Sequence, residues 1–135
     1  AEAFGATDIL DSHGRDSAEW VLEATGGVAK SFECAGSEAC FDLVTRALRP
    51  GGTAVIAGIY EQPLIRVDVS RLITRKLTVT GTQSYCHDFP AAIFAAPSIP
   101  LKKLITHTFP LERLGEALET ALERKRETVK IVIHP

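Results

Sequence analysis

The most informative stretch of the sequence is Thr53-Ala-Val-Ile-Ala-Gly-Ile59, which contains no charged residue. A strand that is apolar on both faces is typical of the interior of a parallel sheet, where helices cover each side. The preceding Arg49-Pro50-Gly51-Gly52 predicts a tight turn, because proline presets one φ and the glycines permit positive φ. We therefore expect a turn over residues 49–52 that leads directly into a buried parallel strand.

Strand and helix patterns alternate on both sides of this stretch. Upstream, Asp16 or Ser17 can cap a helix that runs to Ala24, and Ser37 can cap another, because their side-chain oxygens accept backbone N–H groups. The remaining expected strands are 6–10, 28–34, 64–69, 77–82 and 128–133, and the remaining helices are 69–76, one capped by Asp88, and an amphipathic helix over 111–126. In the expected strand 64–69, apolar and polar residues alternate, as they do in a half-exposed edge strand. The order predicts an α/β fold with a parallel sheet flanked by helices.

Composition excludes several classes of function. The 135 residues carry a formal net charge of −2, with acids and bases interspersed and no basic stripe, so we expect no nucleic-acid partner. No apolar run approaches the roughly 20 residues that span a bilayer. The three cysteines include no C-x-x-C pair, which argues against a disulfide framework or a zinc knuckle. This cysteine pattern indicates a reducing compartment, and the first residues resemble no secretory signal. We therefore expect a cytoplasmic protein without membrane contact.

The residues after each strand are the candidates for ligand binding, because parallel sheets bind ligands at the carboxyl ends of their strands. These residues are Cys34-Ala35-Gly36, Gly58-Ile59-Tyr60 and Gln83-Ser84. Glu33 precedes the first of them in a strand that we expect to be buried. An unpaired buried charge is costly, so Glu33 should find hydrogen-bond donors nearby, and we assign it no catalytic role.

Six short segments spread over almost the whole chain share their order and spacing with a known family. The segments are Phe4-Gly-Ala-Thr-Asp8, Ser31-Phe-Glu-Cys-Ala-Gly-Ser37, Leu48-Arg-Pro-Gly-Gly-Thr53, Ala57-Gly-Ile59, Arg75-Lys-Leu-Thr-Val-Thr-Gly81 and Leu104-Ile-Thr-His-Thr-Phe-Pro-Leu111. None is decisive alone, but together they resemble the zinc-dependent medium-chain dehydrogenase family. The last segment looks most like the polyol, butanediol and threonine dehydrogenase branch of that family.

The resemblance implies the C-terminal portion of such an enzyme. Residues 1–84 would form part of a doubly wound, Rossmann-type dinucleotide-binding domain that lacks its first β-α-β unit, and residues 85–135 would complete the catalytic domain. The G-x-G-x-x-G loop, the acidic ribose-binding residue and the zinc ligands of the family have no counterpart in this sequence. We therefore assign no catalytic and no metal-binding residue. The strand expected at 6–10 would have no neighbour, because strands 1 and 2 of the fold are missing.

The resemblance also implies a binding site for NAD or NADP. Cys34, Ala35 and Gly36 would line the adenosine side, where a small residue lets the ribose approach. Ala57, Gly58 and Ile59 would meet the nicotinamide, whose orientation fixes the face that transfers hydride. The residues that would complete the site are Thr82, Gln83 and Ser84 at the carboxamide and Lys130 at the pyrophosphate.

The family resemblance extends to substrate and assembly. In the full enzyme, zinc would act as a Lewis acid on a small alcohol or polyol substrate. The edge strand 64–69 would pair with its twin across a twofold axis in a homodimer or homotetramer.

Two other interpretations remain open. A methyltransferase-like domain fits the strand–helix alternation and the Leu48–Gly52 turn, and it predicts a C-terminal antiparallel hairpin and binding of S-adenosylmethionine. The Pro110-led amphipathic helix before the last strand argues against it. A non-catalytic nucleotide-binding or dimerisation module would bind a nucleotide or form a dimer without catalysing a reaction.

We predict that the purified chain does not oxidise alcohols, because the resemblance places the zinc ligands outside it. A polyol or butanediol incubated with Zn²⁺, NAD⁺ or NADP⁺ and the chain should give no increase in absorbance at 340 nm over a protein-free control. Zinc-dependent reduction of the nucleotide by the purified chain would contradict this prediction.

Overall fold

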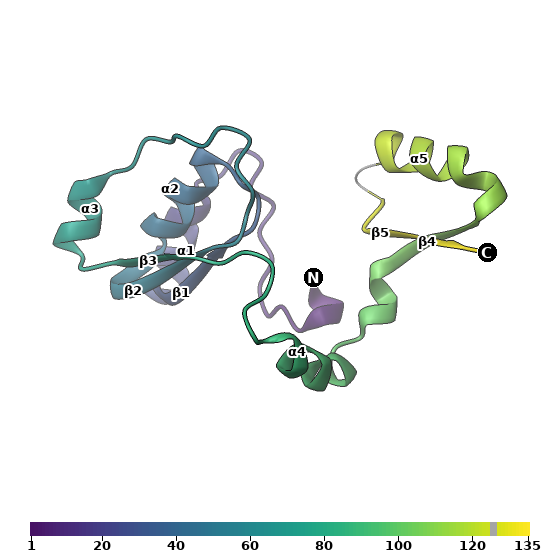
Figure 1. Ribbon diagram of the computed structural model, residues 1–135. Coiled ribbons are helices and arrows are strands. Elements are labelled where there is room, and N and C mark those ends of the chain that lie inside the picture. The colour runs from purple at the N-terminus through teal and green to yellow at the C-terminus, as the bar shows by residue number, and fades with distance from the viewer. Residues whose placement is uncertain (125–126) are drawn as a thin grey trace. The chain divides into compact units, whose positions relative to one another are not determined.

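Three parallel strands form the larger sheet of the computed structural model, which describes residues 1–124 and 127–135 (Figure 1). The strands β1 (Val28–Glu33), β2 (Leu48–Ile56) and β3 (Thr78–Gly81) are neighbours in that order. Residues 53–56 of β2 pair with β1 on one side and β3 on the other. The predicted α/β class and the interior position of this strand are therefore confirmed.

Both N-terminal helices begin at the predicted caps. The Asp16 side chain accepts hydrogen bonds from the amides of Ala18 and Glu19 at the start of α1 (Ser17–Thr25). Ser37 Oγ accepts a bond of 3.2 Å from the amide of Cys40 at the start of α2 (Glu38–Arg46). The two helices contact each other, and both contact β1. Of the two helices, α2 provides the crossover from β1 to β2 that parallel strands require.

The predicted turn at 49–52 lies within β2 as a break in its register. Val28 pairs with Leu48, but the next pair is Lys30 with Thr53, so the residues between Leu48 and Thr53 protrude from the ladder. Gly51 has a φ of 76°, a conformation that glycine adopts at little cost. The prediction of a turn that precedes the strand was wrong, because residues 49–52 belong to β2 and form an irregularity in its pairing with β1.

Neither residues 6–10 nor residues 64–69 form a strand, so both predictions were wrong. Residues 6–10 have no ladder partner in the described part of the chain, as the missing neighbours led us to expect. In the second segment the amide and Nε of Arg66 both bind the Glu38 carboxylate at 3.0 Å. Asp68 then caps α3 (Val69–Thr74) by accepting from the Arg71 amide. Hydrogen bonds to side chains thus take the place of strand pairing in residues 64–69. The predicted dimer contact through this segment stays a prediction, and the segment does not form the strand on which that prediction was based.

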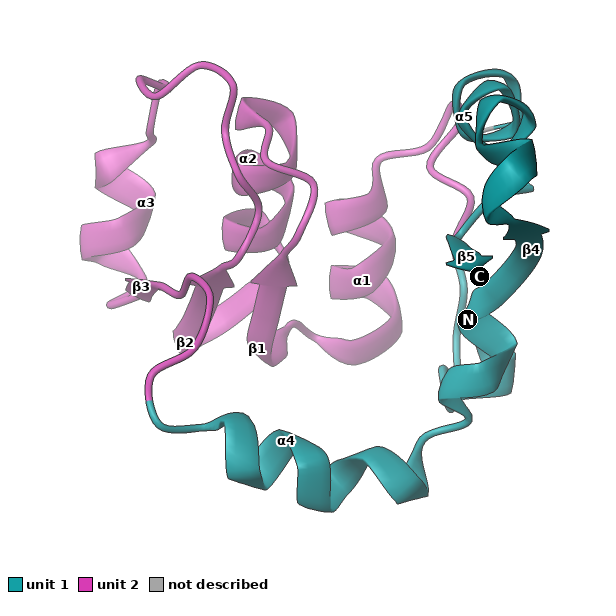
Figure 2. Ribbon diagram, turned by 45° about the vertical axis from the view of Figure 1, so that its right-hand side comes forward, with its two compact units in different colours: residues 1–9, 87–135 teal, residues 10–86 magenta. Residues whose placement is uncertain are grey.

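The chain forms two units, of residues 10–86 and of residues 1–9 with 87–135 (Figure 2). We expected the boundary between residues 84 and 85 and grouped residues 1–9 with the first part. The assignment of functional domains to 1–84 and 85–135 stays a prediction.

A pair of parallel strands organises the unit that contains the C-terminus. β4 (Ile105–Pro110) pairs with β5 (Lys130–His134), and α5 (Leu114–Glu123) contacts both. The predicted end of the amphipathic helix at Arg126 lies outside the described residues. The parallel pair contradicts the antiparallel hairpin that a methyltransferase would have. The unit also contains α4 (Phe89–Ala95), β4's flanking 3-10 turns at Leu101–Leu104 and Leu111–Arg113, and two further 3-10 turns at Glu2–Phe4 and Ala96–Ser98.

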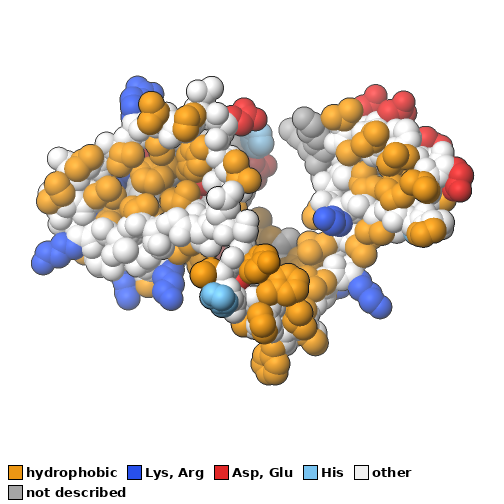
Figure 3. Space-filling view, in the orientation of Figure 1, with side chains coloured by type: hydrophobic (Ala, Val, Ile, Leu, Met, Phe, Trp, Pro, Cys, Tyr) orange, Lys and Arg blue, Asp and Glu red, His pale blue; other side chains and the backbone are white. Residues whose placement is uncertain are grey.

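The buried core is small and lies between α2 and the three-stranded sheet. Val44, Leu48 and Ala54 form its centre, and partly buried apolar side chains pack around it, namely Val28, Leu43, Ile56 and Leu77. Large apolar side chains elsewhere are exposed, among them Leu64 at 90% and Phe94 at 89%, and such side chains gather on the face seen in Figure 3. No described helix is long and apolar enough to cross a membrane.

Arg71 links α3 to α2 through a set of charged hydrogen bonds. Its Nη1 donates to Asp42 Oδ1 at 2.7 Å and to Thr45 Oγ1 at 2.9 Å, and its Nη2 lies 3.2 Å from Asp68 Oδ2. Thr45 is buried, and only 18% of the Arg71 side chain is exposed. Partly buried charged bonds of this kind stabilise more than exposed ion pairs do.

Replacement of Arg71 by alanine should lower the free energy of unfolding by about 1–3 kcal/mol, because Asp42 and Thr45 lose their donor. Arg66→Ala is the matched control, since its side chain is 93% exposed and pairs only at the surface, and it should cost less than about 1 kcal/mol. Urea unfolding of both variants measures the difference. Equal losses would contradict the assigned role of Arg71.

Candidate functional site

The carboxyl ends of the three parallel strands lie at one edge of the sheet. Glu33 pairs with Ile56, and Ile56 pairs with Gly81. Hydrogen bonds continue beyond the ladder, because the amides of Ala57 and Gly58 donate to the Glu33 carbonyl at 2.8 and 2.9 Å. The amide of Thr82 donates to the Ile56 carbonyl at 2.9 Å. The segments that begin at Cys34, Ala57 and Thr82 therefore leave the sheet side by side.

Glu33 is the buried group at this edge, with 1% of its surface exposed. Its Oε1 accepts hydrogen bonds from the amides of Ala35 and Gly36, both at 2.8 Å. The expectation that this carboxylate finds nearby donors is thus confirmed. Because the Glu33 carbonyl also binds Ala57 and Gly58, one residue fixes the backbone of both loops.

Two glycines allow these loops to cross in direct backbone contact. Gly36 has a φ of 74°, and a Cβ there would overlap the backbone of Ile59. A Cβ on Gly58 would overlap Gly36 and reach the Glu33 carboxylate. The crossing therefore requires glycine at position 36 whether or not a ligand binds. The sequence had suggested two other reasons for this glycine, namely a turn and the close approach of a ribose.

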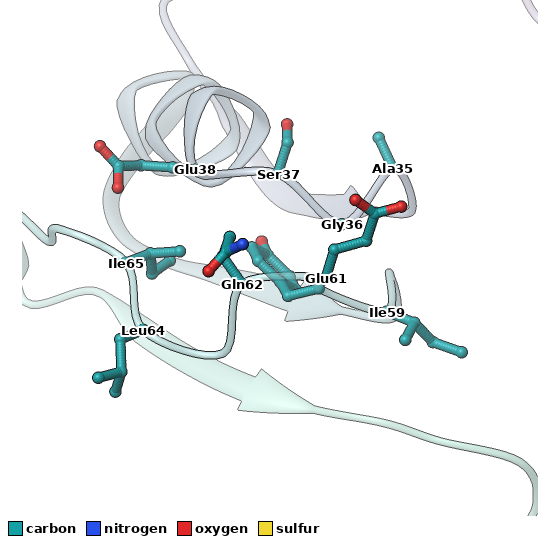
Figure 4. Close-up of a pocket in the computed structure, with 10 residues that line it drawn as sticks. Ala35, Gly36, Ser37, Glu38, Ile59, Glu61, Gln62, Leu64 and Ile65 are labelled. Atoms are coloured by element: carbon teal, nitrogen blue, oxygen red, sulfur yellow. The ribbon is translucent and has the colours of Figure 1, made fainter.

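Two hollows adjoin the crossing. One, of 460 Å³, lies between the start of α2 and the loop of residues 59–65, and Figure 4 shows its lining side chains coming from these two segments. The other, of 420 Å³, is lined mainly by apolar groups around Cys34 and Ala35, including Phe32, Leu43 and Val44. A mainly apolar hollow with a few polar groups is the usual form of a small-molecule site.

We noted Tyr60 among the residues that follow the predicted strands but assigned it no role in the binding site. Its hydroxyl oxygen is buried and, like Glu33 Oε2, makes no hydrogen bond with the described residues. Burial, followed by the neighbouring Glu33 carboxylate, raises the pKa of Tyr60 to about 12. The sequence signal was its position directly after a predicted buried strand, which does not indicate a partner for its hydroxyl group.

The structure places the predicted site residues in two groups. Cys34, Ala35, Gly36, Ala57, Gly58, Ile59, Thr82, Gln83 and Ser84 all follow the carboxyl ends of the three parallel strands. Lys130 belongs to the other unit, where it begins β5 and its carbonyl accepts a bond from Thr106 Oγ1 at 3.2 Å. Its role at the pyrophosphate stays a prediction.

The site offers geometry rather than reactive groups. Among residues 1–124 and 127–135, no three His, Cys, Asp or Glu side chains come together in a way that could hold a metal ion. The residues present therefore do not fit a zinc site. The strand ends instead present backbone groups, small residues and apolar side chains, which suit the binding and orientation of a ligand.

Comparison with known proteins adds the family to this architecture. The zinc-binding dehydrogenase family matches residues 1–96. Sorbitol dehydrogenase from Gallus gallus is 37% identical over 76% of this chain and 29% of its own length, and that from Bos taurus is 34% identical over 98% and 38%. The crystal structure of 2R,3R-butanediol dehydrogenase from Bacillus subtilis superposes with a TM-score of 0.83 at 27% identity, covering 94% of this chain and 38% of that one.

The fold and the strand-end site define a Rossmann-type α/β protein. The chain belongs to the zinc-binding dehydrogenase family. It spans between 29% and 38% of the length of the relatives named above. The predicted family is confirmed, and nothing in the comparisons supports a methyltransferase.

Gly36→Ala should destabilise the chain by two separable effects. The positive φ costs about 1–2 kcal/mol for a residue with a Cβ, and overlap with Ile59 adds about 1–3 kcal/mol. Gly51→Ala is the matched control, because Gly51 has a φ of 76° but open space around its Cβ position. Urea unfolding should show a larger loss for Gly36→Ala, and equal losses would mean that the loops do not cross tightly.

Proposed function

We propose that this chain forms the nicotinamide-nucleotide-facing part of a zinc-dependent alcohol or polyol dehydrogenase, equivalent to the C-terminal portion of such an enzyme. The observation that carries the proposal is the alignment of the three strand ends at one sheet edge, with Glu33 holding the loops after β1 and β2. Ligands of open α/β sheets bind at this edge. The names of the relatives, sorbitol and butanediol dehydrogenases, support an alcohol or polyol as the substrate.

Cys34, Ala35 and Gly36 would hold the adenosine side of the nucleotide. Ala35 and Cys34 line the 420 Å³ hollow, whose apolar walls suit a flat base. The amide of Gly36 is already bound to Glu33, so it orients the turn rather than meeting the ligand. The small side chains here leave room for a sugar to approach the backbone.

Ala57, Gly58, Ile59 and Thr82–Ser84 would face the nicotinamide. The amides of Ala57, Gly58 and Thr82 donate within the protein, so these residues would offer their carbonyl oxygens to the carboxamide NH₂ group. Amides further along, at Gln83 and Ser84, would serve as donors to its oxygen. A carboxamide fixed in this way holds the ring in one orientation, which selects the face for hydride transfer.

The nucleotide would supply the hydride-accepting ring, and zinc held elsewhere in the full protein would supply Lewis-acid activation of the alcohol. This chain contributes binding, orientation and a wall that excludes water from one side. Its exposed apolar side chains, such as Ile59 at 80%, support burial against other parts of a longer protein. The choice between NAD and NADP belongs to residues that we do not identify in this sequence.

Nuclear magnetic resonance with half-ligands tests the proposal on the chain itself. Adenosine monophosphate should shift the amide resonances of residues 34–36, and nicotinamide mononucleotide those of 57–59 and 82–84, with NADH shifting both sets. S-adenosylmethionine serves as the control ligand. Lys76→Ala, which lies away from the strand ends, serves as the control variant and should leave the shifts caused by NADH unchanged. NADH that shifts neither set at millimolar concentration, or S-adenosylmethionine that shifts both, would overturn the proposal.

A further inference from the structure

Two buried oxygen atoms beneath the loop crossing lack hydrogen-bond partners among the described residues. One is Oε2 of Glu33, and the other is the hydroxyl oxygen of Tyr60. Glu33 Oε2 lies at this loop, 2.5 Å from the position that a Cβ would take on Gly58, and Tyr60 is two residues further along the same loop. The Glu33 carboxylate accordingly raises the pKa of the Tyr60 hydroxyl. Buried polar groups are rarely left without hydrogen-bond partners, so two such groups on neighbouring segments need an explanation.

The chemistry of the two groups is complementary. An ionised carboxylate only accepts hydrogen bonds, whereas a phenolic hydroxyl can donate. Oε1 of Glu33 is already engaged by the amides of Ala35 and Gly36, which leaves Oε2 as the free acceptor. Short bonds from hydroxyl groups to carboxylates are among the stronger hydrogen bonds in proteins.

The position of Tyr60 gives such a bond a mechanical consequence. Tyr60 directly follows Ile59, whose backbone contacts Gly36 at the crossing, and its side chain lines the 460 Å³ hollow. The backbone of Glu33 holds only the first two residues of this loop, Ala57 and Gly58. A bond from Tyr60 would fix the loop beyond them and so set the direction of the Ile59 carbonyl.

We propose that Tyr60 donates a hydrogen bond to Glu33 Oε2, and that the two form a positioning pair that holds the nicotinamide-facing loop against the adenosine-facing turn. The role of the pair in nucleotide binding rests on the proposed function, but the bond itself does not. Neither residue contacts the reacting atoms. Tyr60 acts through the backbone of Ile59, and Glu33 acts through the amides of Ala35 and Gly36.

The pair is surrounded by other groups that titrate. Cys40 lies near enough to Tyr60 to act on its ionisation, and Glu38 and Glu61 line the same hollow. The decisive measurements are therefore made at pH 7, where the phenol is protonated, and they use neutral substitutions. Tyr60→Phe removes only the hydroxyl, while Glu33→Gln keeps an acceptor for the two amides and removes the charge.

The first experiment reads the bond directly in the isolated chain. Tyrosine labelled with ¹³C at Cζ gives two signals, from Tyr60 and Tyr85, and Tyr60→Phe identifies them. Glu33→Gln should move the Tyr60 signal and leave that of Tyr85 in place. An unmoved Tyr60 signal in folded Glu33→Gln would overturn the bond.

Amide hydrogen exchange supplies a readout that needs only Tyr60→Phe, should Glu33→Gln fail to fold. Loss of the bond should speed exchange at Gly58 and Gly36 about five- to tenfold, the size expected for the net contribution of one typical hydrogen bond. The amides of the α1 interior should be unchanged. Thr74→Val, which removes an exposed hydroxyl group on α3, is the matched control. Unchanged exchange at Gly58 and Gly36 would overturn the coupling of the loops.

Nucleotide titration then separates this inference from the proposed function. If NADH binds the wild-type chain, Tyr60→Phe should weaken binding about three- to tenfold, in line with the net contribution of one typical hydrogen bond. Thr74→Val, which removes an exposed hydroxyl group on α3, should leave binding unchanged. Equal affinity of Tyr60→Phe and wild type would overturn the positioning role. If NADH does not bind the wild-type chain, the proposed function fails, and the carbon signal and the exchange rates still decide whether the bond exists.

Discussion

The Glu33 carboxylate binds the loop after its own strand, while its backbone carbonyl binds the loop after the neighbouring strand. Both interactions occur where the sheet ends and the regular ladder can no longer position the backbone. A buried charge is tolerated only when it is well bonded, and here the donors are the amides that a ligand-binding edge needs to have fixed. The geometry of this edge follows from the constraint, because the bonds of Glu33 set the spacing of the two loops.

The close crossing of the loops explains why glycine occupies two neighbouring positions in space. Gly36 and Gly58 come from different strand ends, and a side chain on either would force the backbones apart. Preorganisation of this kind lowers the cost of binding, because the groups that meet a ligand need not be ordered at that moment. The described residues at the strand ends hold the backbone in position and include no cluster of three metal-binding side chains.

The core that supports this edge is modest, and charged bonds supplement it. Val44, Leu48 and Ala54 fill the space between α2 and the sheet, while Arg71 holds α3 to the outer side of α2. Arg75 adds bonds to the carbonyls of Arg46 and Leu48, where α2 ends and β2 begins. Many large apolar side chains remain exposed, in keeping with a chain that spans under two fifths of the length of the relatives compared.

The sequence by itself determined the alternation of strands and helices, the Asp16 and Ser37 caps, the interior strand and the family, because each depends on local residue patterns or on ordered motifs. It also located the strand-end segments, since parallel strands end at a common edge. Only the tertiary structure decided that residues 6–10 and 64–69 are not strands, because strand formation depends on a partner and Glu38 binds Arg66 instead. The tertiary structure likewise revealed the place of Tyr60 beside Glu33 and the crossing of Gly36 with Ile59, because both join residues that are distant in sequence and become neighbours only when β1 and β2 pair.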